Sequence, residues 1–138
     1  MKKPSASVLL IEDDPDQALI VAGFLSRLGF VVTSCADAEQ AITRLEEERP
    51  EIVLSDINLP GMGGLDLLRE IRRKHRGSAV ILLTGYGTIE SAIESLRLGA
   101  SDYLIKPVVD AELRLSLKRA LAQRELLATT QQVMYYRE

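Results

Sequence analysis

The sequence predicts an α/β fold: a doubly wound parallel sheet of five strands with helices on both faces. Short apolar runs alternate with segments whose apolar residues recur at helical spacing, and this alternation occurs five times. Four of the runs end directly on a polar or charged residue, which predicts that these side chains meet at the carboxyl edge of the sheet. The strand order 2-1-3-4-5 places the first and third strands, which end on acids, side by side.

The first half of the chain predicts three strands and two helices. An acid at the N-cap and a proline in the first turn, Asp14-Pro15, mark the start of the first helix, and Gly29 closes it. Pro50 ends the second helix before the third strand begins. The predicted strands are 8–11, 31–35 and 52–55, and the second helix is 38–48.

The second half predicts two further strands and three further helices. The third helix follows the Pro60-Gly61 turn and ends in the basic run 72–76, which suits the negative end of a helix dipole. Gly99 closes the fourth helix, which carries Ile89, Ala92, Ile93 and Leu96 at helical spacing. The remaining predicted elements are the strands 80–83 and 103–105 and a long helix, 110–137.

This last helix is longer than one layer of the sheet requires. Residues 111–121 are expected to cover the sheet, so the rest must project or pair. A heptad-like spacing is compatible with a homodimer contact between two such helices, and it passes through positions 113, 117, 120, 124, 127, 131 and 134. Arg124 and Gln131 do not suit an apolar seam, so a linker or frayed tail is the alternative.

Length and composition fit one globular domain. The chain has 138 residues, of which 46% are apolar and 27% are charged, and its net charge is −3. This charge and the aromatic content of 4% argue against direct nucleic-acid binding. The apolar runs are too short for a membrane span, and the lone Cys35 excludes an internal disulfide. We therefore expect a cytoplasmic protein that does not contact the membrane.

Three acids are expected to meet at the carboxyl edge of the sheet. Glu12 and Asp13 end the first strand, and Asp56 ends the third. Carboxylates at such close range repel one another unless a cation lies among them, and Mg²⁺ suits a site with few protein ligands and several waters. The alternative is that the first two acids cap the following helix, but capping does not explain Asp56. The sequence therefore predicts a Mg²⁺ site.

Lys106 and Thr84 add a positive charge and a hydroxyl group to the same edge. Lys106 follows a buried strand and precedes Pro107, which aims the lysine and whose peptide bond is a candidate for the cis form. Taken alone, Lys106 could be an ordinary surface lysine and Thr84 an ordinary strand-ending residue. Together with the acids they form a phosphoryl-transfer site, in which a carboxylate is the nucleophile and the other groups neutralise the phosphoryl oxygens.

This ordered set of motifs resembles the receiver domain of two-component response regulators, a family with a flavodoxin-like fold. The resemblance extends from Val8 to Leu121 and rests on Glu12-Asp13, Asp56 followed by Pro60-Gly61, Thr84-Gly85 and Lys106-Pro107. It implies a receiver domain over residues 1–123 and a helical extension or linker over residues 124–138.

The resemblance implies that Asp56 is the phospho-acceptor and takes its phosphoryl group from a histidine of a sensor kinase. Asp13 and Asp56 would bind Mg²⁺ directly, together with the main-chain carbonyl of Asn58, and Glu12 would act through a coordinated water. Lys106 would pair with the acceptor and then with its phosphate. The protein would promote only its own phosphorylation and dephosphorylation, and would not otherwise be an enzyme.

Thr84 and Tyr103 resemble the switch pair of the family, in which the threonine moves to the phosphate and the aromatic side chain moves inward behind it. The alternative for Tyr103 is a strand aromatic with its hydroxyl in water. The fourth helix, fifth strand and fifth helix would form the output surface and a possible homodimer contact. Asn58 and Tyr86 stand where the family tunes dephosphorylation, and Tyr86 is expected to shield the phosphate from water.

Within the family, the segment 85–92 (GYGTIESA) and the leucine-rich last helix are most similar to the NtrC-like class. Regulators of that class carry an ATPase domain and a DNA-binding domain after the receiver, and they regulate transcription. The 138 residues contain neither domain, so a receiver with its linker is expected. An extension that leads to a different output or to a kinase is the alternative.

Three other functions are compatible with parts of the sequence. An aspartyl-phosphate phosphatase would use Asp56 as a transient nucleophile, but it needs an acid where Asn58 stands. A flavodoxin-like cofactor binder is disfavoured, because Glu12-Asp13-Asp14 would repel a cofactor phosphate. A receiver-like protein-interaction module that is not regulated by phosphorylation is the third possibility.

The single histidine, His75, lies within the basic run 72–76. It is expected on a solvated helix end and without a catalytic role. The neighbouring basic residues are expected to form a charged surface rather than a contact with DNA.

Overall fold

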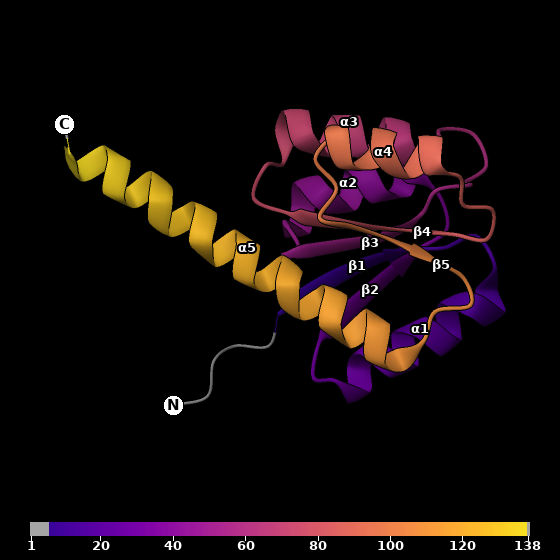
Figure 1. The fold of residues 1–138 in the computed structure, drawn as a ribbon. Helices are drawn as coiled ribbons and strands as arrows, with labels where there is room; N and C mark the ends of the chain where they lie inside the picture. Colours follow the sequence, from indigo (N-terminus) through magenta and orange to yellow (C-terminus); the bar gives the residue numbers. More distant parts are fainter. Residues whose placement is uncertain (1–5, 138) are drawn as a thin grey trace.

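A parallel sheet of five strands forms the centre of the molecule, with the predicted order β2-β1-β3-β4-β5 (Figure 1). The computed structural model describes the backbone of residues 6–137 and the side chains of residues 6–126. The strands are β1 (Ser7–Ile11), β2 (Val31–Cys35), β3 (Ile52–Asp56), β4 (Ala79–Thr84) and β5 (Asp102–Ile105). The predicted strands are confirmed, and Asp56 and Thr84 are the last residues of their strands rather than the first residues after them.

Five helices cover the two faces of the sheet. Helices α2, α3 and α4 lie on one face, and α1 and α5 lie on the other (Figure 1). Their bounds are α1 (Pro15–Arg27), α2 (Ala38–Glu48), α3 (Gly64–Lys74), α4 (Ile89–Arg97) and α5 (Asp110–Arg137). Right-handed crossovers between parallel strands produce this three-layer arrangement.

Alternate residues of the buried strands supply the two halves of the core. In β1, Leu9 and Ile11 pack with α2 and α3, whereas Val8 and Leu10 pack with α1 and α5. This division follows from the two-residue period of a strand. Each fully buried leucine or isoleucine contributes about 1.5–3 kcal/mol relative to an exposed one, so burial on both faces holds the strand ends in fixed register.

The helix ends follow the signals in the sequence, with one exception. Asp14 caps α1, because its Oδ1 accepts a hydrogen bond of 2.9 Å from the amide of Asp16. Gly29 follows α1 with a φ of +96°, a conformation that favours glycine. At the end of α2, however, the left-handed position is occupied by Arg49, with a φ of 46°.

Helix α4 forms where the spacing predicts it, but its apolar side chains are largely solvent-exposed. Ile89 is 77% exposed, and Ile93 and Leu96 are also exposed, whereas the small Ser95 faces the protein. The apolar spacing therefore indicates the helix correctly, while its apolar surface is available for a partner rather than used in the core.

Helix α5 continues well past the edge of the sheet (Figure 1). The first three positions of the predicted seam are buried against the sheet: Leu113, Leu117 and Ala120. Their spacing therefore results from packing in the core of the domain and not from a dimer contact. Arg124 donates hydrogen bonds to the Gly77 carbonyl and Glu51. The side chains at seam positions 127, 131 and 134 lie outside the described residues. No helix in the described part of the chain is long and apolar enough to span a membrane.

Candidate functional site

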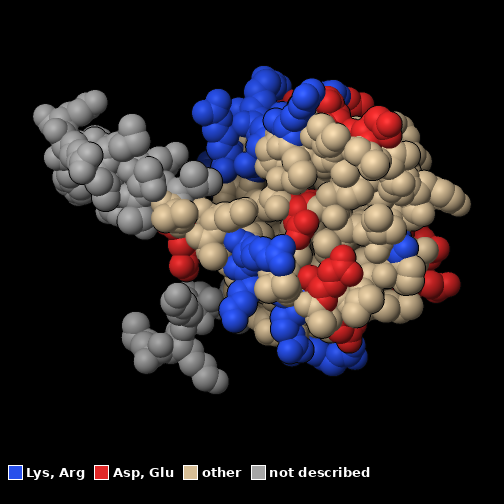
Figure 2. Space-filling view, viewed as in Figure 1, with Lys and Arg blue, Asp and Glu red and all other residues tan. Residues whose placement is uncertain are grey.

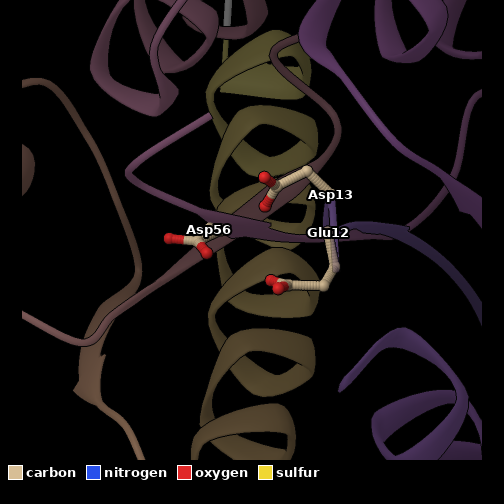
Figure 3. Close-up of side chains that lie close together, drawn as sticks. All are labelled: Glu12, Asp13 and Asp56. Carbon is tan, nitrogen blue, oxygen red and sulfur yellow. The ribbon is translucent and has the colours of Figure 1, made fainter. Parts of the chain in front are cut away.

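The pairing of β1 with β3 brings the three predicted acids together. Ile11 lies opposite Ser55 in this pair, so Glu12 and Asp56 occupy adjacent strand ends. One carboxylate oxygen from each of Glu12, Asp13 and Asp56 lies within 4.8 Å of the others, and the three side chains converge on one space (Figure 3). Glu12 and Asp56 are buried, whereas Asp13 is exposed. This geometry suits a hard divalent cation with oxygen ligands and bound waters.

Lys106 reaches these acids from β5, two strands away from Asp56 in the sheet. Its Nζ donates hydrogen bonds of 2.8 Å to Asp56 Oδ2 and 3.0 Å to Glu12 Oε2. The main-chain amide of Lys106 donates a hydrogen bond of 2.7 Å to the Thr84 carbonyl, which fixes the position of the Lys106 backbone. The Lys106–Pro107 peptide bond is cis. The lysine side chain is only 19% exposed. Lys106 is therefore not an ordinary surface lysine with its ammonium group in water.

The charges of the site act on one another. Burial raises the pKa of Glu12 above its usual value, although Lys106 opposes this effect. Burial alone would lower the pKa of Lys106, but its hydrogen bonds to Asp56 and Glu12 outweigh burial and raise it. The lysine is therefore held as a cation, which is the form that can pair with an incoming phosphoryl group.

Gln17 belongs to the site, although sequence reasoning did not find it. Its Oε1 accepts a hydrogen bond of 2.8 Å from Lys106 Nζ, so Gln17 supplies a third acceptor for the ammonium group. Its Nε2 lies 3.5 Å from Asp14 Oδ2. Gln17 lies in the first turn of α1, and a polar residue on a helix surface carries no sequence signal that distinguishes it from a solvated one.

Thr84 ends β4 beside the acids and is completely buried. Its Oγ1 accepts hydrogen bonds of 3.3 Å from Asn58 Nδ2 and 3.1 Å from the amide of Tyr86. The main-chain amide of Asn58 in turn donates a hydrogen bond of 3.0 Å to Asp56 Oδ1. The loops after β3 and β4 are thus joined through one hydroxyl group, directly beside the Asp56 carboxylate.

Tyr103 lies in β5, beside β4, and contacts α4. Its hydroxyl lies 2.7 Å from the hydroxyl of Ser91, and the ring packs partly against the core. In this structure the Tyr103 hydroxyl is therefore held by α4, whereas the alternative places it in water. A Cβ atom added to Gly87 would lie 3.4 Å from the Tyr103 hydroxyl, which shows how closely the loop after β4 covers it.

A pocket of about 700 Å³ opens over the acids. Its volume is within the range of small-molecule sites, so it can admit a phosphoryl group together with part of its donor. Tyr86 stands at its mouth and is 86% exposed. The polar and aromatic lining residues are Glu12, Asp13, Asp14, Gln17, Asp56, Asn58, Tyr86 and Lys106, and Ile20, Val21, Pro107 and Val108 add apolar surface.

The basic run 72–76 lies at the other end of the molecule. The prediction that His75 lies on a solvated helix end is partly wrong. His75 is half-buried, and its Nε2 is enclosed without a hydrogen-bond partner among the described residues. Arg72 is also half-buried, and it donates to the Ser78 carbonyl, because the turn between α3 and β4 folds back over it.

Comparison with known proteins agrees with this geometry. Residues 8–118 match the response regulator receiver domain family. The C4-dicarboxylate transport transcriptional regulatory protein DctD of Pseudomonas aeruginosa is 38% identical over 120 residues, which cover 87% of this chain and 26% of that protein. The transcriptional regulatory protein ZraR of Klebsiella oxytoca is 32% identical over 126 residues, with coverages of 91% and 28%. This chain thus spans about a quarter of each of these two relatives.

Solved structures show the same fold. A response regulator receiver domain protein from Clostridium thermocellum superposes with a TM-score of 0.84 at 30% identity, covering 88% of this chain and 98% of that one. NtrX from Brucella abortus superposes with a TM-score of 0.86 at 34% identity, covering 94% and 29%. Similarity to DctD, ZraR and NtrX supports the NtrC-like class. The chain belongs to the response regulator receiver domain family.

Proposed function

We propose that Asp56 accepts a phosphoryl group from a histidine of a sensor kinase, and that this modification switches the protein between signalling states. One observation carries the proposal: the Asp56 carboxylate receives the ammonium of Lys106 at 2.8 Å within a cluster of three acids. A structural ion pair does not require two further acids beside it. A phosphoryl-transfer site requires this combination of nucleophile, cation and cation-binding oxygens.

In the proposed reaction an Asp56 oxygen attacks phosphorus, the P–N bond of the phosphohistidine breaks, and an acyl phosphate forms on Asp56. Asp13, Asp56 and the main-chain carbonyl of Asn58 would hold Mg²⁺, and Glu12 would act through a water. The metal would supply positive charge to the phosphoryl oxygens. Lys106 supplies a second positive charge and already stands within hydrogen-bond distance of the carboxylate.

The change at Asp56 would pass to the surface through Thr84 and Tyr103. The Thr84 hydroxyl would turn to donate to the new phosphate, and this movement would disturb the hydrogen bonds that it accepts from Asn58 Nδ2 and the main-chain amide of Tyr86. Tyr103 would then move inward and lose its hydrogen bond to Ser91 of α4. Because α4 carries exposed Ile89, Ile93 and Leu96, its displacement would alter the apolar output surface formed by α4, β5 and α5.

We assign residues 1–123 to the receiver and residues 124–138 to a helical linker toward an output region, as in transcription regulators of the NtrC-like class. The protein would act in the cytoplasm, promote only its own phosphorylation and dephosphorylation, and make no direct contact with nucleic acid. Homodimers would form through the α4-β5-α5 surface or the end of α5. Light scattering with Mg²⁺ and beryllofluoride, on wild type and Asp56→Ala, would show whether assembly depends on Asp56.

The deciding experiment is incubation with a small phosphodonor and Mg²⁺, followed by mass spectrometry. Wild type should gain one phosphoryl group at Asp56, and Asp56→Asn should gain none. An unmodified wild type would instead support an interaction module that is independent of phosphorylation. Rapid turnover of the donor would support a phosphatase, although the amide of Asn58 cannot act as the acid or base that such an enzyme needs at this position.

A further inference from the structure

A second pocket, of about 550 Å³, lies at the amino edge of the sheet, at the opposite end of the strands from Asp56. Residues before β3 and before β4 line it, together with a residue of α5. Its charged and titratable lining residues are Glu46, Arg49, Lys74, His75, Arg76 and Arg124. Figure 2 shows Lys and Arg side chains gathered at the upper left, where Figure 1 places the end of α3.

The pocket is strongly positive. Four cations from three separate segments line it, and Glu46 is the single acid among the described residues of the lining. Lys74 pairs with Glu70 at 3.3 Å, and Arg124 pairs with Glu51 at 3.4 Å, so two of the cations are partly neutralised.

The other two cations, Arg49 and Arg76, have no acid partner among the described residues. Within the described part of the chain, the side chain of Arg76 donates one hydrogen bond, to the Arg72 carbonyl at 3.3 Å. Burial, and then the charge of Arg76, lower the pKa of the neighbouring Arg72. Positive charge in this region is therefore not balanced by the protein itself.

Two further observations separate this pocket from an ordinary basic helix end. Lysine and arginine at a helix C-terminus often do no more than compensate the helix dipole. That role does not explain the enclosed Nε2 of His75, which has no hydrogen-bond partner in the described part of the chain. Nor does it explain why Arg49 occupies a left-handed position, with a φ of 46°, where glycine would be less strained.

We propose that this pocket binds a compact oligophosphate, such as pyrophosphate, tripolyphosphate or the phosphate chain of a nucleotide. The planar guanidinium groups of Arg49 and Arg76 can each donate two parallel hydrogen bonds to phosphate oxygens. Among the described residues that line it, the only aromatic ring is the half-buried imidazole of His75, and there is no Phe, Tyr or Trp, so the pocket offers little surface on which a nucleobase could stack. A concave pocket of this size suits a small anion better than an extended nucleic-acid backbone.

The test titrates the full 138-residue chain with tripolyphosphate in metal-free buffer, observed by calorimetry and by amide chemical shifts. Binding should saturate, and the shifts should cluster at residues 46–50, 74–78 and 124 rather than at the acidic site. Arg49→Ala combined with Arg76→Ala should weaken binding at least about tenfold, whereas Arg27→Ala combined with Lys118→Ala, two exposed cations elsewhere, should not. Asp56→Asn should bind as wild type does, because the two sites are separate.

Arg49→Gly gives the sharpest variant, since two properties should move in opposite directions. Glycine adopts the left-handed conformation without the strain that a larger residue has there, so the melting temperature should not fall and is expected to rise by a few degrees. Oligophosphate binding should nevertheless weaken, and Arg49→Lys should restore part of it. Equal losses in the pocket and control double variants, unsaturable binding, shifts centred on Asp56, or tighter binding to a DNA duplex than to tripolyphosphate would each overturn the proposal.

Discussion

The ammonium group of Lys106 lies 2.8 Å from Asp56 Oδ2 and 3.0 Å from Glu12 Oε2, so one cation directly after β5 holds the last residue of β3 and the first residue after β1. These residues are 50 and 94 positions away from Lys106 in the chain. The three strand ends are therefore joined by charge as well as by the sheet. A group that binds at Asp56 must change the surroundings of Lys106 at the same time.

Replacing this cation should destabilise the protein. Lys106→Met leaves Glu12 and Asp56 close together without a positive charge, and the free energy of unfolding in chelator should fall by about 2 kcal/mol. Adding Asp56→Asn should recover part of the loss, because it removes the repulsion. Urea denaturation measures both effects. Lys118→Met, at an exposed lysine, serves as the control, and an equal loss there would mean that the ion pair contributes nothing.

Mg²⁺ should stabilise the folded protein, because the unfolded chain lacks the acid cluster. At a concentration one hundred times the dissociation constant, the gain is about 2.7 kcal/mol, measured as a rise in melting temperature. Asp13→Asn and Asp56→Asn should lose most of this rise. Asp16→Asn, which changes an exposed acid in the first turn of α1, should keep it. Full stabilisation of Asp13→Asn would remove Asp13 from the metal site.

Gln17 is expected to position Lys106 for phosphoryl transfer. Gln17→Leu removes the third hydrogen-bond acceptor of the Lys106 ammonium group. The lost hydrogen bond is worth about 1 kcal/mol at this exposed position, so phosphorylation by a small phosphodonor should be about fivefold slower. Gln17→Glu keeps an acceptor oxygen at the same place and should stay close to the wild-type rate. A wild-type rate in Gln17→Leu, or equal losses in both variants, would contradict this role.

Tyr86 is expected to protect the acyl phosphate from water. Its ring stands at the mouth of the pocket, so folding over Asp56 would exclude the attacking water. The phosphoprotein of Tyr86→Ala should therefore hydrolyse several times faster than wild type, while Tyr86→Phe, which keeps the ring, should match wild type. The half-life is measured by gel-shift analysis after removal of the donor. A wild-type half-life no longer than that of Tyr86→Ala would exclude shielding.

The thiol of Cys35 should make the free energy of unfolding fall as the pH becomes alkaline. Burial, and secondarily Asp37, raise the pKa of its thiol from 9.0 to about 11. Between these values the unfolded chain loses the thiol proton while the folded chain keeps it, so stability falls as pH rises. Relative to Cys35→Ala, wild type should lose about 1 kcal/mol between roughly pH 8 and pH 10. Parallel profiles for the two proteins would show that the thiol does not contribute.

Much of the site could be predicted because parallel strands all present their carboxyl ends at one edge. Once the runs before Glu12, Asp56 and Thr84 are identified as strands, their terminal residues must lie near one another. The same reasoning does not reach Gln17, which enters the site from a helix surface. Nor could it show that the apolar side chains of α4 are exposed, because spacing indicates which residues share a helical face but not whether another element covers that face.

The sequence by itself determined the order of strands and helices and the acids at the strand ends. It also identified the candidate residues for phosphoryl transfer. Local patterns suffice for these features, since periodicity, caps and strand-ending residues are properties of short segments. Only the tertiary structure decided that Lys106 bridges Glu12 and Asp56, that Tyr103 contacts Ser91, and that a basic pocket forms at the opposite edge. Each of these depends on distances between elements far apart in the chain, and packing across the whole sheet sets those distances.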